Sequence, residues 1–157
     1  MFNIVHASNA DLDNIIKFIH TEWSNNHLLA RDKSFFIYEF QENNKINFIL
    51  AKDDLNEIIG CLGFIKSNFS DKPDIWTSIW KVSKKSLDPA LGIRLFKYLR
   101  ENIIHRHLLA PGADIITMPI YKRLGIETGV LRQYYILNPR LNIFKNAKVE
   151  NYKSKDH

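Results

Sequence analysis

The stretch Met118-Pro-Ile-Tyr-Lys-Arg-Leu-Gly-Ile126 is the most informative part of this sequence. It predicts a short helix that carries one tyrosine, Tyr121, and that is closed by Gly125. The helix runs into Thr128–Leu137, a segment rich in residues that favour β-strands. We therefore expect a helix followed by strands near the carboxyl end of the chain.

The amino-terminal part of the chain predicts one strand followed by two helices. Residues 2–6 can form the strand, and Ser8 followed by Asp11 is typical of a helix start. The helix then shows apolar residues at helical spacing, namely Leu12, Ile15, Ile16, Ile19 and Trp23. After a linking segment, 24–30, a second helix is expected over 32–41.

The middle of the chain predicts three strands. The apolar runs 47–52 and 57–65 are separated by the short polar segment 53–56, which indicates an antiparallel hairpin. After a polar loop, the segment 75–82 carries apolar residues on both faces. This pattern is typical of a central strand that is covered on both sides, with Trp76 as a core residue.

A third long helix and a short strand follow. Pro89 precedes a helix predicted over 90–105, whose apolar stripe contains Leu91, Leu95, Phe96, Leu99 and Ile103. A short strand is expected at 107–110, and Pro111-Gly112 predicts the turn that leads toward Tyr121.

Composition and charge favour one globular domain that covers residues 1–157, with a polar tail from about residue 145. The net charge is +5, but the sequence contains no long basic run with interleaved aromatic residues, so we do not expect nucleic-acid binding. The sequence shows no signal peptide and no apolar run long enough for a membrane helix, so a cytoplasmic protein is expected. Cys61, the single cysteine, lies in an apolar run and is interpreted as a core residue.

The order of these elements resembles that of a GCN5-related N-acetyltransferase (GNAT) domain, and the resemblance covers nearly the whole chain. It implies an α/β (α+β) fold with a central mixed, mostly antiparallel twisted sheet flanked by helices. More narrowly, the segments 27–30, 74–82 and 118–125 resemble the GNAT module of bacterial surface-polysaccharide biosynthesis proteins. The implied activity is acetyl transfer from acetyl-CoA to an amine of a sugar or sugar nucleotide, in a ternary complex.

The resemblance also implies where the cofactor binds. GNAT domains hold the pyrophosphate of CoA at a loop and a helix amino terminus, usually with the pattern Arg/Gln-x-x-Gly-x-Gly/Ala. The matching residues here are Leu87-Asp-Pro-Ala-Leu-Gly92, in which Ala90 replaces the first glycine and Leu87 replaces the Arg or Gln. The predicted cofactor-binding residues are Trp80, Lys81 and Val82 on the strand, and Leu87, Ala90, Leu91, Gly92, Ile93 and Arg94.

Catalytic roles follow from the same resemblance. Tyr121 is the expected general acid, because a tyrosine hydroxyl can donate a proton to the departing thiolate. Asp74 is a candidate base, although it could equally be a turn former. His27 is expected to bind the acceptor first and to act as a base second, with Arg31 as an acceptor-binding residue. Asp114 is a further candidate base, and no residue spacing suggests a metal site.

One alternative function and the oligomeric state stay open at this stage. The altered glycine pattern also fits a non-catalytic GNAT-like module that binds a ligand or a partner chain. Pairing of strands at the carboxyl end would offer a route to a homodimer.

Overall fold

The computed structural model describes residues 2–67, 70–132, 136, 138 and 140. The chain divides into two compact units, Met1–Ala113 and Asp114–His157, and each is described by itself below. The expectation of a single domain therefore stays a prediction.

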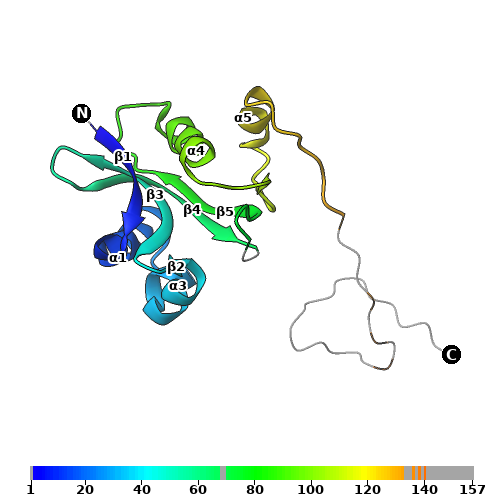
Figure 1. Ribbon diagram of the computed structural model, residues 1–157, viewed down its shortest axis with the longest axis horizontal. Coiled ribbons are helices and arrows are strands. Elements are labelled where there is room, and N and C mark those ends of the chain that lie inside the picture. The colour runs from blue at the N-terminus through cyan, green and yellow to red at the C-terminus, as the bar shows by residue number, and fades with distance from the viewer. Residues whose placement is uncertain (1, 68–69, 133–135, 137, 139, 141–157) are drawn as a thin grey trace. The chain divides into compact units, whose positions relative to one another are not determined.

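The first unit is built on one mixed, mostly antiparallel sheet (Figure 1). Its strands lie in the order β1-β3-β4-β5-β6, and β2 pairs with β3 off this path. Every pairing is antiparallel except that of β5 with β6, which is parallel. The strand bounds are β1 Phe2–Ser8, β2 Gln41–Glu42, β3 Lys45–Asp53, β4 Ile58–Lys66, β5 Ile75–Val82 and β6 Leu108–Leu109.

The predicted hairpin is confirmed as β3 and β4. Its turn is held by Asp53, whose Oδ1 accepts the N–H groups of Leu55 at 3.0 Å and Glu57 at 2.9 Å. Asn56 adopts a positive φ of 62°, a conformation that asparagine tolerates better than most residues. A polar turn of this kind fixes the register of the two strands that it connects.

The first helix begins where the sequence predicts. Ser8 and Asp11 form a capping box, and a 3₁₀ turn, Asn9–Asp11, leads into α1, Leu12–Phe18. The Asp11 carboxylate also pairs with Lys52 of β3 at 2.5 Å, and both side chains are nearly buried. This ion pair ties the start of α1 to the sheet.

A π-helical turn, η2 Ile19–Trp23, continues α1 without a break. The segment predicted as a link to the second helix instead leads into a short helix, α2 Leu28–Arg31. The second predicted helix is α3, Lys33–Phe40, and Asp32 caps it by accepting the Phe35 N–H at 2.9 Å.

Helices cover both faces of the sheet (Figure 1). On one face, α1 and α3 pack on a core that includes a cluster of three buried phenylalanines, Phe36, Phe40 and Phe48. Phe48 also covers Gly63 on β4, where a Cβ atom would lie only 2.8 Å from the ring. On the other face, α4 Leu91–Asn102 buries Leu91, Leu95, Phe96 and Leu99. The predicted apolar stripe is confirmed, although the helix ends at Asn102 rather than at His105.

One strand interpretation was wrong. The segment Ile75–Val82 does form β5, but it is not covered on both sides along its whole length. Trp76 is 43% exposed and is therefore not a core residue. The reason is the face on which it lies: neighbouring strand residues point to opposite faces, and Ile75 is buried while Trp76 is exposed, so one face of the sheet is open at this point.

The second unit contains α5, Met118–Arg123, which confirms the helix predicted around Tyr121. Gly125 follows it with a positive φ of 73°, which glycine adopts without strain. The strands expected over 128–137 are not found in the described part of that range, residues 128–132 and 136. Val130 and Leu131 are 90% and 82% exposed there, so their side chains do not join a core. The rest of the range lies outside the described residues.

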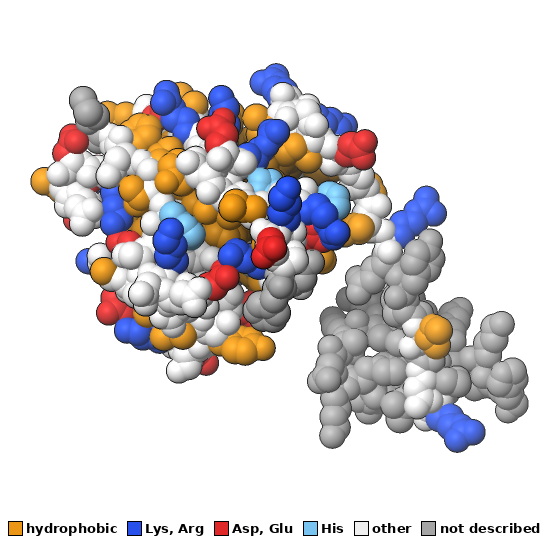
Figure 2. All heavy atoms as spheres, viewed as in Figure 1, with side chains coloured by type: hydrophobic (Ala, Val, Ile, Leu, Met, Phe, Trp, Pro, Cys, Tyr) orange, Lys and Arg blue, Asp and Glu red, His pale blue; other side chains and the backbone are white. Residues whose placement is uncertain are grey.

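Charged side chains of both signs are distributed over the surface. Figure 2 shows Lys and Arg scattered among Asp and Glu on the face in view. Within the described residues, no helix combines the length and apolar character needed to cross a bilayer.

Replacing Asp11 with asparagine should destabilise the fold in a pH-dependent way. Burial raises the pKa of Asp11, but the hydrogen bonds from Lys52 and Ser8 outweigh it, so the net pKa is lowered. A lowered folded-state pKa stabilises the protein above the unfolded pKa, and this contribution is lost as pH falls through the folded value. Urea unfolding at pH 7 should give the variant a free energy of unfolding about 2 kcal/mol lower than that of the unmodified protein. This difference between the two proteins should become smaller below about pH 4.

Asp13→Asn is the matched control, because Asp13 is 79% exposed and pairs with Lys33 at the surface. This control variant should lose less than about 1 kcal/mol in its free energy of unfolding. Equal losses for the two variants would contradict the role given to the Asp11–Lys52 pair.

Candidate active site

The site predicted from the sequence centres on the carboxyl end of β5. Pairing of β5 with β6 covers only Ile75 and Trp76, and Thr77 Oγ1 donates to the Leu109 carbonyl at 3.3 Å. In the described part of the first unit, no strand flanks the rest of β5 on that side. The sheet therefore has an open edge near Lys81 and Val82.

The register of β4 and β5 decides which backbone groups face this edge. The Ser83 N–H donates to the Ile59 carbonyl at 2.9 Å, and Val82 lies opposite Gly60. In an antiparallel ladder, hydrogen-bonded and non-hydrogen-bonded pairs alternate, so the N–H and C=O of Val82 point away from β4. A ligand with amide groups could pair with them as an added strand would.

Trp80 connects this strand end to the first turn of α4. Its indole Nε1–H donates to the Gly92 carbonyl at 3.1 Å, and its ring stacks on Phe96 at a centroid distance of 5.5 Å. Gly92 allows the close approach, since a Cβ atom there would already contact the indole at 3.4 Å. The side chain of Trp80 therefore positions the amino terminus of α4 beside β5.

The amino terminus of α4 is lined by a carboxylate as well as by backbone donors. Asp88 Oδ1 accepts the Ala90 N–H at 2.8 Å, and its Oδ2 pairs with Arg94 Nε at 3.0 Å. The Leu91 N–H donates to the Asp88 carbonyl at 3.2 Å, and a helix amino terminus favours an anion. Arg94 also lies over the ring of Phe2, at 5.9 Å from its centroid. Leu87, in the preceding loop, is 99% exposed.

Asp74 lies at the opposite end of β5, about 25 Å along the strand from Val82. Its carboxylate accepts two hydrogen bonds from Arg106, at 3.0 and 2.7 Å, and lies 2.9 Å from His107 Nδ1. The hydrogen bond from Arg106, together with that from His107, lowers the pKa of Asp74 to about 2. Such a carboxylate is a poor proton acceptor at neutral pH.

His27 and Arg31 bracket the short helix α2. The Leu29 N–H donates to His27 Nδ1 at 3.2 Å, so His27 caps this helix. This contact assigns the lone pair to Nδ1 and the proton to Nε2, which makes the outer nitrogen a donor. The ring also contacts Trp23 edge-on, at a centroid distance of 6.3 Å. Arg31 is exposed at the end of α2.

Tyr121 and Asp114 belong to the second unit. Tyr121 is 5% exposed. Asp114 accepts the Ile116 N–H at its Oδ1, at 2.9 Å, and its carbonyl accepts the Thr117 hydroxyl at 2.7 Å. These local contacts make Asp114 a turn-forming residue ahead of α5.

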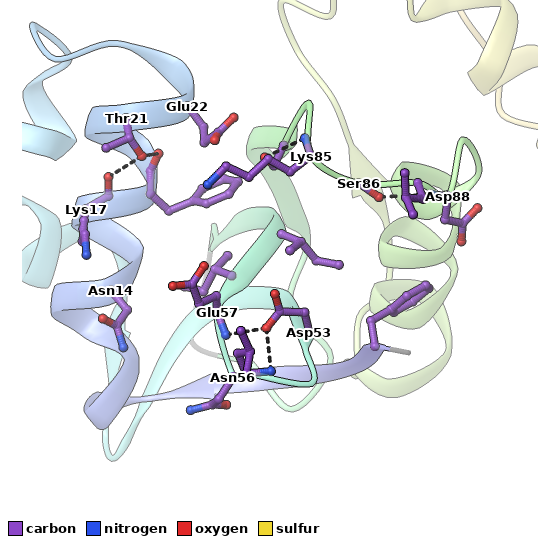
Figure 3. A pocket seen from close by; sticks show the side chains of 17 residues that line it. Asn14, Lys17, Thr21, Glu22, Asp53, Asn56, Glu57, Lys85, Ser86 and Asp88 are labelled. Atoms are coloured by element: carbon purple, nitrogen blue, oxygen red, sulfur yellow. Dashed lines mark hydrogen bonds between the residues drawn. The ribbon is translucent and has the colours of Figure 1, made fainter.

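The structure also reveals a cavity of about 850 Å³ in the first unit, which sequence reasoning missed (Figure 3). It is lined by α1 and η2, by the turn between β3 and β4, and by the loop after β5. Its polar lining residues include Asn14, Lys17, Thr21, Glu22, Glu57 and Lys85. No local motif could have identified it, because these residues come from three separate segments.

Two other chemistries find no support in the described residues. Burial raises the pKa of the Cys61 thiol to about 12, so a thiolate nucleophile is not accessible there. The described residues also contain no cluster of three or more His, Cys, Asp or Glu side chains suited to a metal ion.

Replacing Trp80 with phenylalanine should loosen the link between β5 and α4. The variant keeps an aromatic ring against Phe96 but loses the hydrogen bond to the Gly92 carbonyl. We expect a loss of about 1 kcal/mol in the free energy of unfolding and faster amide exchange in the first turns of α4. Trp76→Phe, at the exposed tryptophan, is the control and should change neither quantity measurably. Unchanged exchange in Trp80→Phe would contradict this positioning role.

Comparison with known proteins supports the fold. No protein-family model matches the sequence, and neither does any curated protein sequence. Among solved structures, the aminoglycoside N-acetyltransferase AAC(6')-Iy, in complex with the bisubstrate analogue CoA-S-monomethyl-acetylneamine, is 12% identical with a TM-score of 0.63. The match covers 88% of this chain and 99% of that one.

Two further structures give similar results. An aminoglycoside acetyltransferase from an uncultured soil metagenomic sample is 15% identical, with a TM-score of 0.63, and covers 88% of this chain and 99% of its own. A "possible acetyltransferase" from Clostridium difficile 630 is 18% identical, with a TM-score of 0.58 and the same coverage of 88% and 99%. The chain therefore has the fold of these GNAT acetyltransferases, which confirms the fold class predicted from its sequence.

Proposed function

We propose that the protein transfers an acetyl group from acetyl-CoA to an amine. The observation that carries this proposal is the open edge of β5 beside the amino terminus of α4, held together by the Trp80–Gly92 hydrogen bond. An edge with free amide groups suits a pantetheine arm, and a helix amino terminus suits a pyrophosphate. The structural neighbour that carries a CoA analogue supports the same assignment.

In this proposal, the donor lies along the end of β5. The N–H and C=O of Val82, which point away from β4, pair with the pantetheine, whereas those of Lys81 face β4 in the same register. Trp80 and Lys81 stay predicted cofactor-binding residues beside Val82, and the residues predicted for the pyrophosphate are Leu87, Ala90, Leu91, Gly92, Ile93 and Arg94. Arg94 would exchange part of its pairing with Asp88 for a pairing with phosphate, which guanidinium groups bind well.

The reaction needs one bond to form and one to break. The amine nitrogen attacks the thioester carbonyl carbon, and the carbon–sulfur bond then breaks. The acid that protonates the departing thiolate stays the predicted Tyr121, which would regain a proton from solvent. Because Asp74 is held by Arg106 and has a lowered pKa, we assign the loss of the amine proton to solvent rather than to Asp74.

The acceptor is proposed to be an amine of a sugar or of a sugar nucleotide. His27 Nε2–H and the Arg31 guanidinium are donors close together in the sequence, and they suit hydroxyl, carboxylate or phosphate oxygens. The aminoglycosides named for two structural neighbours are also amino sugars. The amino-sugar nucleotide, the cytoplasmic location and the homodimer stay predictions.

A second candidate function is a non-catalytic module with the same fold. The observation that favours it is the Asp88 carboxylate, which already accepts the Ala90 N–H and pairs with Arg94 at the amino terminus of α4. These groups are therefore engaged before any phosphate binds. Binding of acetyl-CoA distinguishes the two candidates.

Calorimetric titration should detect binding of acetyl-CoA to the full chain at micromolar concentrations. Arg94→Met should weaken the affinity about tenfold, because one charged hydrogen-bond partner of the phosphates is lost. Lys97→Met is the matched control, since Lys97 is an exposed cation on the same helix but beyond its first turn. If the unmodified protein shows no binding at high micromolar acetyl-CoA, the enzyme proposal is wrong and the module is favoured.

Tyr121→Phe should lower kcat about 100-fold while the Kd for acetyl-CoA stays nearly constant. The phenylalanine retains the ring but cannot donate a proton. Tyr38→Phe provides the control, because Tyr38 is 82% exposed on α3. Steady-state turnover and calorimetry on both variants measure the two quantities, and an unchanged kcat would remove Tyr121 from the role of acid.

A further inference from the structure

Three apolar side chains form a row across neighbouring strands at the start of β5. Ile65 of β4 lies opposite Trp76 of β5, and Trp76 lies beside Leu109 of β6. Side chains of directly paired residues project from the same face of a sheet, with Cβ atoms about 5 Å apart across an antiparallel pair. Ile65 packs against the core, whereas Trp76 is 43% and Leu109 41% exposed. We call these three side chains the apolar row.

The apolar row lies where the open edge of β5 ends. The Thr77 hydroxyl donates to the Leu109 carbonyl at 3.3 Å, and beyond Trp76 none of the described strands pairs with β5 on that side. A ligand chain that follows the edge from Val82 toward Thr77 therefore meets the end of β6 and must turn onto a face of the sheet. One face is closed there, because Ile75 is fully buried. The chain is thus directed onto the face that carries the apolar row.

The length of pantetheine places its sulfur on this path. From an amide that pairs with Val82, about eight bonds lead to the sulfur, which equals nearly three extended residues, or about 9 Å. The sulfur therefore lies level with Trp80, and the acyl group that it carries continues toward the apolar row.

The remaining distance is longer than an acetyl group. Trp80 pairs with Leu62 and Trp76 with Ile65, so the two levels are three residues of β4 apart, or about 10 Å. Beyond the sulfur, an acetyl group spans about 2 Å and a straight six-carbon acyl group about 7 Å. Because apolar atoms make contact within about 4 Å, the six-carbon group reaches the apolar row and the acetyl group does not.

We propose that the donor site also accepts acyl groups longer than acetyl, and that Trp76 and Leu109 determine this specificity by contacting the acyl chain. The inference rests on the proposed function, because it extends the donor path along β5. The bonds that form and break are those of the proposed transfer, with a longer acyl group in place of acetyl. Each methylene that moves from water onto the apolar row strengthens binding by up to about fourfold.

Calorimetric titration of the full chain with CoA, acetyl-CoA and hexanoyl-CoA tests this specificity. The three ligands share the same pyrophosphate and pantetheine, so they differ only in the group that would reach the apolar row. Hexanoyl-CoA should bind at least about tenfold more tightly than acetyl-CoA, whereas acetyl-CoA and CoA should differ by less than about threefold.

Two substitutions locate the acyl chain. Trp76→Ala and Leu109→Ala should each reduce the preference for hexanoyl-CoA to less than about threefold while the Kd for acetyl-CoA stays constant. The constant Kd also shows that the variants are folded. Tyr38→Ala is the control, because it removes an exposed aromatic side chain from α3 and should keep the full preference.

The outcomes separate this inference from the proposed function. Equal binding of hexanoyl-CoA and acetyl-CoA would overturn the inference and leave the proposed function intact. A preference for hexanoyl-CoA that both variants retain would also overturn it, since the acyl chain would then lie elsewhere. If none of the three ligands binds, the proposed function is wrong and the inference fails with it.

Discussion

The candidate site depends on one constraint: within the described residues, β5 has a strand on both sides only at Ile75 and Trp76. Beyond Trp76 the strand continues along β4 alone, so the backbone of Val82 faces an open edge. The Trp80 indole then holds the first turn of α4 against the same strand end through the Gly92 carbonyl. The backbone donors of the β5 edge and of the α4 amino terminus therefore lie close together, because β5 lacks a second partner strand there and Trp80 connects β5 to α4.

The charge at this helix terminus limits how tightly an anion can bind. A helix amino terminus favours negative charge, and Asp88 already supplies one by accepting the Ala90 N–H and pairing with Arg94. A pyrophosphate would have to compete with this carboxylate for the same donors. The affinity for a pyrophosphate therefore depends on the Asp88 carboxylate as well as on the replacement of the first glycine by Ala90.

Much of the fold and part of the site follow from local sequence patterns. The Ser8–Asp11 capping box, the hairpin turn at Asp53 and the glycine at 125 were predictable, because each depends on residues within a few positions of one another. Trp76 was misjudged because apolar residues on both faces of a strand do not reveal whether another element covers each face. No strand forms in 128–132, the described start of the segment 128–137 in which strands were expected, since β-forming residues need a partner strand to pair with.

By itself, the sequence determined most of the helices and strands of the first unit and the helix at Tyr121, because periodicity and capping act over short distances, and its resemblance to the GNAT family indicated the fold class. The tertiary structure alone decided the chemistry of individual side chains. Asp74 became a poor base because Arg106 and His107, more than 30 positions away, lie against it. The cavity lies between segments that are distant in sequence, and only folding brings such segments together.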